Sequence, residues 1–243
     1  MADVTEIAAD IFRISVYEPA FAMQFNQYLV RDDEPLLFHS GLRRHFDESS
    51  TALAALIDPA QLRWIGFSHF EADECGAVPL WQATAAQATP LCSLVGKMVS
   101  VDDTFPETPA RGLDDNETFS TGRHTFRFLR TAHVPHGWDA GLLLEEDAKV
   151  LFCSDLFTHR GNVPAETSSD IAGRFAADAR ADAAGPFAHA YPFDTAVERT
   201  LERLKALAPR TLALMHGSTF HGDGAAAIED LTRVLQELDR TGP

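Results

Sequence analysis

The chain has 243 residues, and its 20 basic against 36 acidic side chains give a formal net charge of −16. This balance argues against nucleic acid or an anionic membrane surface as a partner, because both are bound largely through Lys and Arg. With 45% hydrophobic and 23% charged residues, the composition is that of a globular protein that buries a full core.

The first part of the chain predicts a β-rich start that then alternates with helices. Short apolar runs broken by turn signals are typical of strands, and the polar stretch 31–34 predicts a hairpin turn. The expected elements are strands at 11–17, 26–30, 35–39 and 62–67, and helices at 47–57 and 77–85. A dense polar segment, 68–76, lies between a strand and a helix, where α/β proteins tend to place their sites.

The rest of the chain predicts a second β-rich part that ends in an α-β-α order. Residues 101–123 are rich in Asp, Thr, Pro and Gly and are expected to be mostly loop. Residues 158–190 predict a partly helical surface insertion. The expected elements are strands at 125–129, 141–144, 150–153 and 211–215, and helices at 197–207 and 225–238. This order suggests two sheets with helices outside them, in a single domain over 1–243.

The cysteines and the N-terminus bear on the compartment. Cys75, Cys92 and Cys153 are odd in number and widely spaced, so they form neither a complete disulfide framework nor a close-paired zinc module. The N-terminus lacks a basic leader region, and no apolar run approaches the roughly 20 residues of a membrane span. We therefore expect a cytoplasmic protein that does not bind a membrane.

The strongest chemical feature is the segment His69-Phe70-Glu71-Ala72-Asp73-Glu74, which directly follows an apolar strand. Alternate positions in an extended or tightly turned loop project to a common side, so His69, Glu71 and Asp73 could converge on one or two cations. The alternative is a solvated acidic loop that caps the following helix.

Three later strands also end in a metal-ligand type of residue. The strand at 125–129 leads to His133 and His136, that at 150–153 to Asp155, and that at 211–215 to His216. Each such residue alone is more often a hydrogen-bonded or surface group. Together they supply imidazoles and carboxylates from four strand ends, which is how a dinuclear centre is built on a rigid scaffold.

These motifs resemble the metallo-β-lactamase superfamily and, within it, the diiron branch of flavodiiron proteins and stand-alone oxygen-binding relatives. The resemblance covers nearly the whole chain. His69-x-Glu71-x-Asp73 is similar to the branch's His-x-Glu-x-Asp, whereas zinc members have His-x-His-x-Asp-His. His136-Gly137-Trp138-Asp139 matches a ligand His followed three residues later by Asp, although the branch usually places its Trp one residue earlier.

The resemblance implies an α/β (α+β) fold, the four-layer αββα metallo-β-lactamase sandwich, and a ligand set. One metal would take His69, Glu71 and His136, the other Asp73 and His216, with Asp155 bridging. Glu71 in place of a histidine favours two iron ions, with zinc or manganese as alternatives, because carboxylate-rich sites suit redox-active metals. No catalytic side chain is expected beyond the metal ligands.

Four further residues are left with open roles. The branch commonly has His where this chain has Glu74, which would add a fourth carboxylate if it points inward and would otherwise face solvent or cap a helix. His39 stands where the superfamily often has a supporting Asp, so it is either a support for the ligands or simply buried. His133 could replace His136 as a ligand. His221 could hydrogen-bond to a ligand residue or line the pocket mouth, or it could be a surface histidine.

The functional expectation is a non-haem dinuclear iron protein that binds dioxygen. It would act in sensing, or in reduction of dioxygen or nitric oxide with a separate flavin or iron electron donor. Flavodiiron proteins carry a flavodoxin-like domain after this one; the chain stops at Pro243, so we expect no FMN in it. The alternative is a metal-dependent hydrolase of an ester, thioester or phosphodiester that uses a metal-bound hydroxide. A homodimer is left open.

Overall fold

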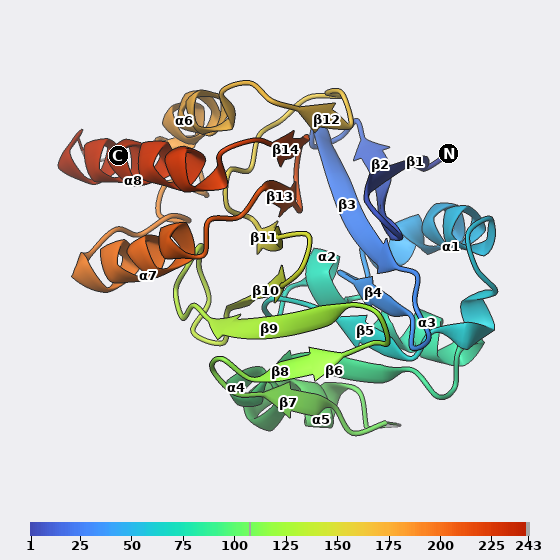
Figure 1. Cartoon of the computed structure of the whole chain (residues 1–243). Helices are drawn as coiled ribbons and strands as arrows, with labels where there is room; N and C mark the ends of the chain where they lie inside the picture. The colour runs from blue at the N-terminus through green and yellow to red at the C-terminus, as the bar shows by residue number, and fades with distance from the viewer. Residues whose placement is uncertain (107, 242–243) are drawn as a thin grey trace.

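Two β-sheets packed face to face, with helices on both outer faces, form the molecule (Figure 1). The computed structural model describes residues 1–106 and 108–241. The fold is therefore the four-layer αββα sandwich predicted from the sequence. No helix among these residues is both long and apolar enough to cross a bilayer.

The first sheet contains seven strands that lie in chain order. They are β1 (Asp3–Ala8), β2 (Ile11–Glu18), β3 (Met23–Val30), β4 (Leu36–Phe38), β5 (Trp64–Gly66), β6 (Thr89–Ser93) and β7 (Arg111–Leu113). The strands from β1 to β4 pair antiparallel, and those from β4 to β7 pair parallel. Parallel neighbours need long crossovers, which here contain helical segments. These are η1 (Arg43–His45), α1 (Phe46–Ala54), η2 (Pro59–Gln61), α2 (Ala72–Cys75), α3 (Val78–Thr84), α4 (Leu94–Gly96), the π-helical turn η3 (Lys97–Val101) and α5 (Asp102–Thr104).

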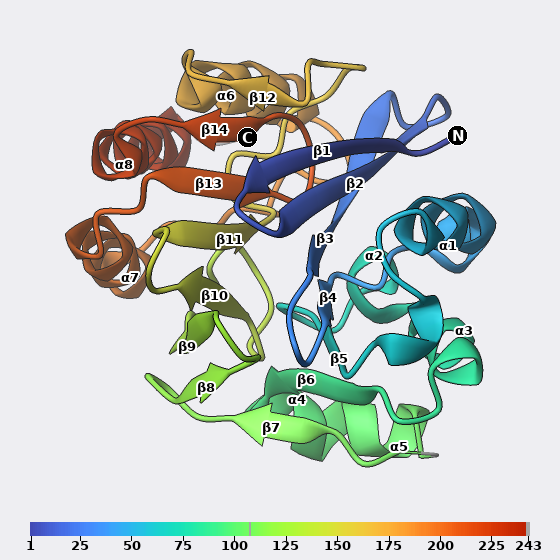
Figure 2. The ribbon, with the colours of Figure 1, turned by 45° about the vertical axis from the view of Figure 1, so that its right-hand side comes forward.

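The second sheet has the order β12-β14-β13-β11-β10-β9-β8. Its strands are β8 (Thr118–Ser120), β9 (Thr125–Arg130), β10 (Gly141–Glu145), β11 (Val150–Ser154), β12 (Glu166–Thr167), β13 (Thr211–Leu214) and β14 (Thr219–His221). Three helices cover its outer face, as Figure 2 shows: α6 (Ile171–Asp182), α7 (Thr195–Ala206) and α8 (Gly224–Thr241). The parallel pair β11 and β13 brings the carboxyl ends of two strands to one edge.

Alternation along the central strands explains the layering. In β11, Val150 and Phe152 lie in the core between the sheets, whereas Leu151 and Cys153 pack against the helices of the second sheet. Leu37 of β4 points in the same way to the helices of the first sheet, between two residues that face the second sheet. Because successive strand residues point to opposite faces, apolar runs without alternation of polarity mark strands buried on both sides.

The structure adds detail to the sequence prediction in two segments. Residues 101–123 are mostly loop, as expected, but they also contain the short elements α5, β7 and β8. Residues 158–190 contain β12 and α6, and α6 buries Ile171 and Phe175 in the core that it shares with α8. That segment is thus partly helical, as expected, but it belongs to the helical layer and is not only a surface insertion.

Candidate metal centre

Loops after four strand ends bring the metal-ligand types of residue together. His69 follows β5, His136 follows β9, Asp155 follows β11 and His216 follows β13. Glu71 lies in the first of these loops, and Asp73 stands in the first turn of α2. One ligand atom from each of His69, Glu71, His136 and Asp155 lies within 4.8 Å of the others.

The carboxylate of Asp155 lies between two groups of side chains. Its Oδ2 is 3.6 Å from His69 Nε2 and 3.3 Å from His136 Nε2, and Glu71 Oε1 is 3.3 Å from the same His136 nitrogen. Its Oδ1 is 3.2 Å from His216 Nε2, which in turn lies 3.3 Å from Asp73 Oδ2. The arrangement contains two adjacent donor sets that share one carboxylate.

These donor sets fit a pair of cations. His69 Nε2 and Asp155 Oδ1 are buried without a hydrogen-bond partner, although buried polar atoms are normally satisfied. Both atoms face the cluster. Imidazole nitrogen and carboxylate oxygen in this mixture suit iron, manganese or zinc, so metal ions would satisfy the atoms that the protein leaves unpaired.

Contacts on the far side of two rings orient them toward the cluster. His216 Nδ1 donates to the carbonyl of Gln24 at 2.9 Å, and His69 Nδ1 lies 2.9 Å from Ser68 Oγ. In both rings this directs Nε2 to the centre as the free lone pair. Such outer contacts fix the tautomer and raise the basicity of a metal-bound imidazole.

The carboxylates also change the proton affinity of the imidazoles. Burial lowers the pKa of His69, but the nearby carboxylates of Glu71, Glu74 and Asp155 outweigh it and raise that pKa to about 10. Burial also lowers the pKa of His216, but the carboxylates of Asp155 and Asp73 outweigh it and raise that pKa to about 10. Without metal the site thus holds protons where cations would sit, and metal binding would release them.

Glu74 does not face the centre, nor does it face solvent. Its side chain is fully buried and contacts the far side of His69, with Oε1 3.6 Å from Nδ1. It accepts hydrogen bonds from Ser68 N at 2.8 Å, Ser68 Oγ at 2.7 Å, Ser154 Oγ at 2.8 Å and His39 Nδ1 at 2.7 Å. His39 does not contact the cluster either. Its ring is buried against Glu74.

The remaining candidate histidines lie outside the cluster. His133 is exposed in the turn before His136, with a positive φ of 65°. His221 pairs with Glu166 of β12 at 2.7 Å and does not line the cavity over the cluster. Asp139, which the motif spacing singled out, accepts from Phe70 N at 3.0 Å and so holds the loop that carries Glu71.

Sequence reasoning missed the polar side chains that hold the loop after β13. Asn26 Nδ2 donates to Leu214 O at 2.8 Å and to Gly217 O at 2.9 Å, and the buried Arg13 donates to the same Gly217 oxygen at 3.1 Å. His159 Nε2 accepts from Ser218 N at 3.1 Å. A signal was present, since β2 and β3 alternate apolar residues with polar ones that are also buried, Arg13 and Asn26 among them.

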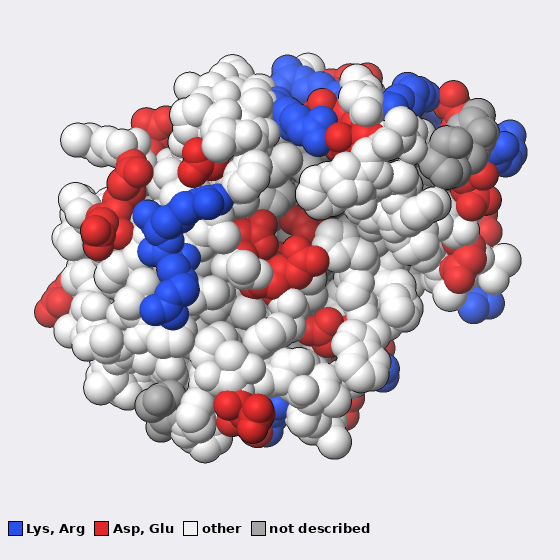
Figure 3. All heavy atoms as spheres, turned by 180° about the vertical axis from the view of Figure 1, so that it is seen from behind, with Lys and Arg blue, Asp and Glu red and all other residues white. Residues whose placement is uncertain are grey.

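A cavity of about 560 Å³ lies directly over the cluster, and Glu71, Asp73, His136, Asp155 and His216 form part of its lining. Figure 3 shows this face of the molecule, with acidic side chains gathered in a hollow and basic side chains on two sides of it. The cluster is therefore open to a ligand from this face.

Comparison with known proteins gives one family match and one curated relative. The family model described as "ODP family beta lactamase" matches residues 23–217. The rubredoxin-oxygen oxidoreductase of Megalodesulfovibrio gigas is 29% identical over 134 residues, which are 55% of this chain and 33% of that protein. The match thus covers about a third of the length of this relative.

Solved structures share the whole fold. The rubredoxin oxygen:oxidoreductase from Desulfovibrio gigas superposes with a TM-score of 0.81 at 21% identity, covering 96% of this chain and 62% of that one. A mutant of the flavo di-iron protein from Thermotoga maritima gives a TM-score of 0.80 at 19% identity, with 96% and 60% covered. The chain therefore has the fold of these proteins over about three fifths of their length.

Proposed function

Because the chain belongs to the ODP family of beta-lactamase proteins, we propose that it is a dinuclear iron protein that binds dioxygen. With electrons from a separate flavin or iron protein, it reduces dioxygen or nitric oxide. The curated relative is named an oxygen oxidoreductase that uses rubredoxin, which supports this choice of reaction and of donor class. We also propose that residues 1–243 act as a single domain of this fold.

The observation that carries the proposal is the position of Asp155. Its two oxygens face different histidine groups, with Oδ2 3.3 Å from His136 Nε2 and Oδ1 3.2 Å from His216 Nε2. A carboxylate shared in this way is suited to bridge two cations. His69, Glu71 and His136 would hold one ion and Asp73 and His216 the other.

The chemistry of a bound iron pair is electron transfer to a diatomic ligand, and the protein residues serve that chemistry by orientation. Gln24 O fixes the tautomer of His216 by accepting from Nδ1, which leaves Nε2 free. Glu71, half-exposed in the cavity, is the carboxylate that replaces an imidazole of zinc sites. A site with mixed imidazole and carboxylate donors suits a metal that changes oxidation state.

Metal analysis and gas turnover test the proposal together. Protein purified without oxygen should contain about two irons per chain, and with a chemical reductant it should consume dioxygen or nitric oxide. Asp155→Ala should lose both ions, whereas His216→Ala should lose mainly one. Asp147→Ala, an exposed carboxylate on the β10–β11 turn, is the matched control and should keep the full metal content.

One result would replace this proposal by the hydrolase alternative. Two zinc ions per chain, with turnover of an ester, thioester or phosphodiester and no gas consumption, would contradict the iron assignment.

A further inference from the structure

The cavity over the candidate metal ligands is far larger than a diatomic gas requires. Its volume is about 560 Å³, whereas a water molecule, of size comparable to dioxygen, takes about 30 Å³ in the liquid. Cavities of roughly 300–1,000 Å³ are typical of sites that enclose an organic ligand. The volume therefore indicates an organic ligand in addition to the gas.

The walls of this cavity are mainly apolar and aromatic, and the two aspartates of α6 that also line it, Asp178 and Asp182, lie against Arg160. One wall comes from the β2–β3 hairpin, and the other comes from α6 and the segment that follows it. Their apolar lining residues are Phe21, Met23, Phe25, Phe175, Ala179, Phe187, Ala190 and Tyr191. Phe21 is 50% and Phe187 62% exposed, so two phenyl rings stand at the mouth in contact with water. Exposed rings beside a cavity favour an apolar ligand body.

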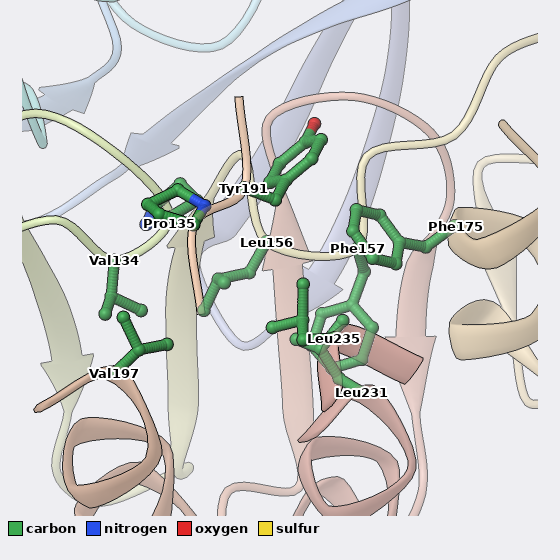
Figure 4. A pocket seen from close by; sticks show the side chains of 10 residues that line it. Val134, Pro135, Leu156, Phe157, Phe175, Tyr191, Val197, Leu231 and Leu235 are labelled. Carbon is green, nitrogen blue, oxygen red and sulfur yellow. The ribbon is translucent and has the colours of Figure 1, made fainter. Parts of the chain in front are cut away.

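The wall formed by Tyr191 is backed by the core. Figure 4 shows Tyr191 and Leu156 together with Phe175 of α6 and with Leu231 and Leu235 of α8. The rings of Tyr191 and Phe175 meet edge to face with centroids 4.8 Å apart, and the space left among these side chains is only about 10 Å³. Because a close-packed support leaves this wall little room to collapse, the cavity is preformed.

Two arginines line the cavity, and they differ in how well they are paired. Arg160 Nη2 pairs with Asp182, and its Nη1 lies 3.8 Å from Asp178. Arg44 has only a 3.5 Å contact from Nε to Glu18, and its guanidinium lies 5.1 Å from the centroid of the Phe21 ring. Within the described part of the chain, neither Nη of Arg44 has a hydrogen-bond partner. Arg44 is thus the cation that is free to bind an anionic ligand group.

We propose that the cavity binds a medium-chain or aryl-alkyl carboxylate beside the metal centre. Its carboxylate pairs with Arg44, and its apolar body lies along Phe21, Phe25 and Tyr191 over the metal ligands. This inference rests on the proposed function, because the apolar end of the acid would lie next to the proposed metal pair.

Isothermal titration with octanoate tests the inference on both metal-loaded and metal-free protein, with acetate and hexylammonium as comparison ligands. Octanoate should bind once per chain to both forms, and the two comparison ligands should not bind. Arg44→Gln should weaken octanoate binding roughly 10- to 100-fold, the effect of losing a charge-assisted pair. Arg43→Gln removes the adjacent exposed charge, which does not line the cavity, and should change the affinity less than about twofold.

A second pair of variants tests the location. Ala190→Trp and Ala179→Trp each place an indole in the cavity, and either one should abolish octanoate binding while the circular dichroism spectrum stays unchanged. Absence of saturable octanoate binding to the wild-type protein would overturn the inference, and so would equal effects of Arg44→Gln and Arg43→Gln. Binding that requires metal and ignores Arg44 would also contradict it. Protein that binds octanoate but retains no metal would contradict the proposed function alone.

Discussion

Glu74 shows at the scale of one residue how the chain accommodates its departure from the diiron pattern. A buried carboxylate is costly unless several donors satisfy it, and Glu74 has four, two from Ser68 and one each from Ser154 and His39. The resemblance implies an Asp at position 39 and a His at position 74. This chain has the two types of side chain the other way round, a base at His39 and an acid at Glu74. His39 and Glu74 form a buried hydrogen-bonded pair behind the centre, and Glu74 supports His69 through Ser68.

Removing this support should weaken metal binding. Glu74→Gln replaces an accepting oxygen by an amide that donates, so it opposes the donors of His39 or Ser68 and releases the ring of His69. We expect a loss of roughly 10- to 100-fold in metal affinity, as for other contacts behind a ligand. Competition with a chelator measures this loss. Asp147→Asn removes an exposed carboxylate and should leave the affinity unchanged; equal affinities in both variants would show that Glu74 does not support His69.

His124, the residue directly before β9, should make the stability of the fold depend on pH. The hydrogen bond to Glu145, with burial opposing it, raises the pKa of His124. The folded state thus binds this proton more tightly than the unfolded state. The stabilisation is fully present below the unfolded pKa of 6.5 and is lost as the pH rises through the higher folded pKa. The loss of unfolding free energy in His124→Gln should therefore be larger at about pH 5.5 than at about pH 8.5. Urea titrations at both pH values measure it, and a difference independent of pH would contradict it.

Residue spacing predicted which side chains converge, but not how each one points. The spacing to Asp139 favoured His136 over His133, and the turn before His136 does leave His133 exposed. The direction of Glu74 depends on donors from β11 and from the end of β4, which are distant in the chain. No local pattern contains that information.

At the scale of elements, α6 should depend on its N-terminal cap. Asp170 Oδ1 accepts from Gly173 N at 2.7 Å, which satisfies one of the free amides of the first turn. Asp170→Ala should cost about 1 kcal/mol of unfolding free energy. Asp103→Ala removes an exposed carboxylate that has no described partner, and thermal unfolding should show less than about 0.5 kcal/mol for it. Equal losses would contradict the capping role.

Strongly periodic elements were predictable, whereas short elements at sheet edges were not. The apolar residues at helical spacing that predicted α1, α7 and α8 are close together in the sequence. The strands β9, β10 and β11 are apolar runs with clear turns between them. The strands β1, β6, β7, β8, β12 and β14 are short or polar, and their existence depends on pairing with a neighbour that is distant in the sequence. The buried face of α6 was hidden because its Ala-rich sequence gives weak periodicity.

At the scale of the whole molecule, the core between the sheets should make the fold cooperative. Phe152 is fully buried there, and its ring lies 5.4 Å from Tyr28 and 5.3 Å from Phe38 of the other sheet, measured between ring centroids. Phe152→Ala should therefore cost about 3–5 kcal/mol. Tryptophan fluorescence reports mainly the first sheet and its helices through the buried Trp64 and Trp81, since Trp138 in the loop after β9 is exposed, and circular dichroism reports the entire chain. Both should give one coincident urea transition that shifts in the variant, and two separate transitions would contradict the prediction.

The architecture also explains why the site lies where the sequence places its ligand types. The ends of β5, β11 and β13 meet at one edge of the sandwich, and the loop after β9 reaches the same edge. Both sheets thus contribute ligands, so a correctly folded sandwich is a condition for the centre.

Two metal ions should lie on either side of Asp155, and anomalous X-ray diffraction at the iron edge would locate them. Crystals of anaerobically purified protein should show two iron peaks per chain. One should lie among His69, Glu71 and His136, and the other between Asp73 and His216, with one oxygen of Asp155 toward each. A single peak, no peak, or two peaks that appear only at the zinc edge would contradict a dinuclear iron centre at Asp155.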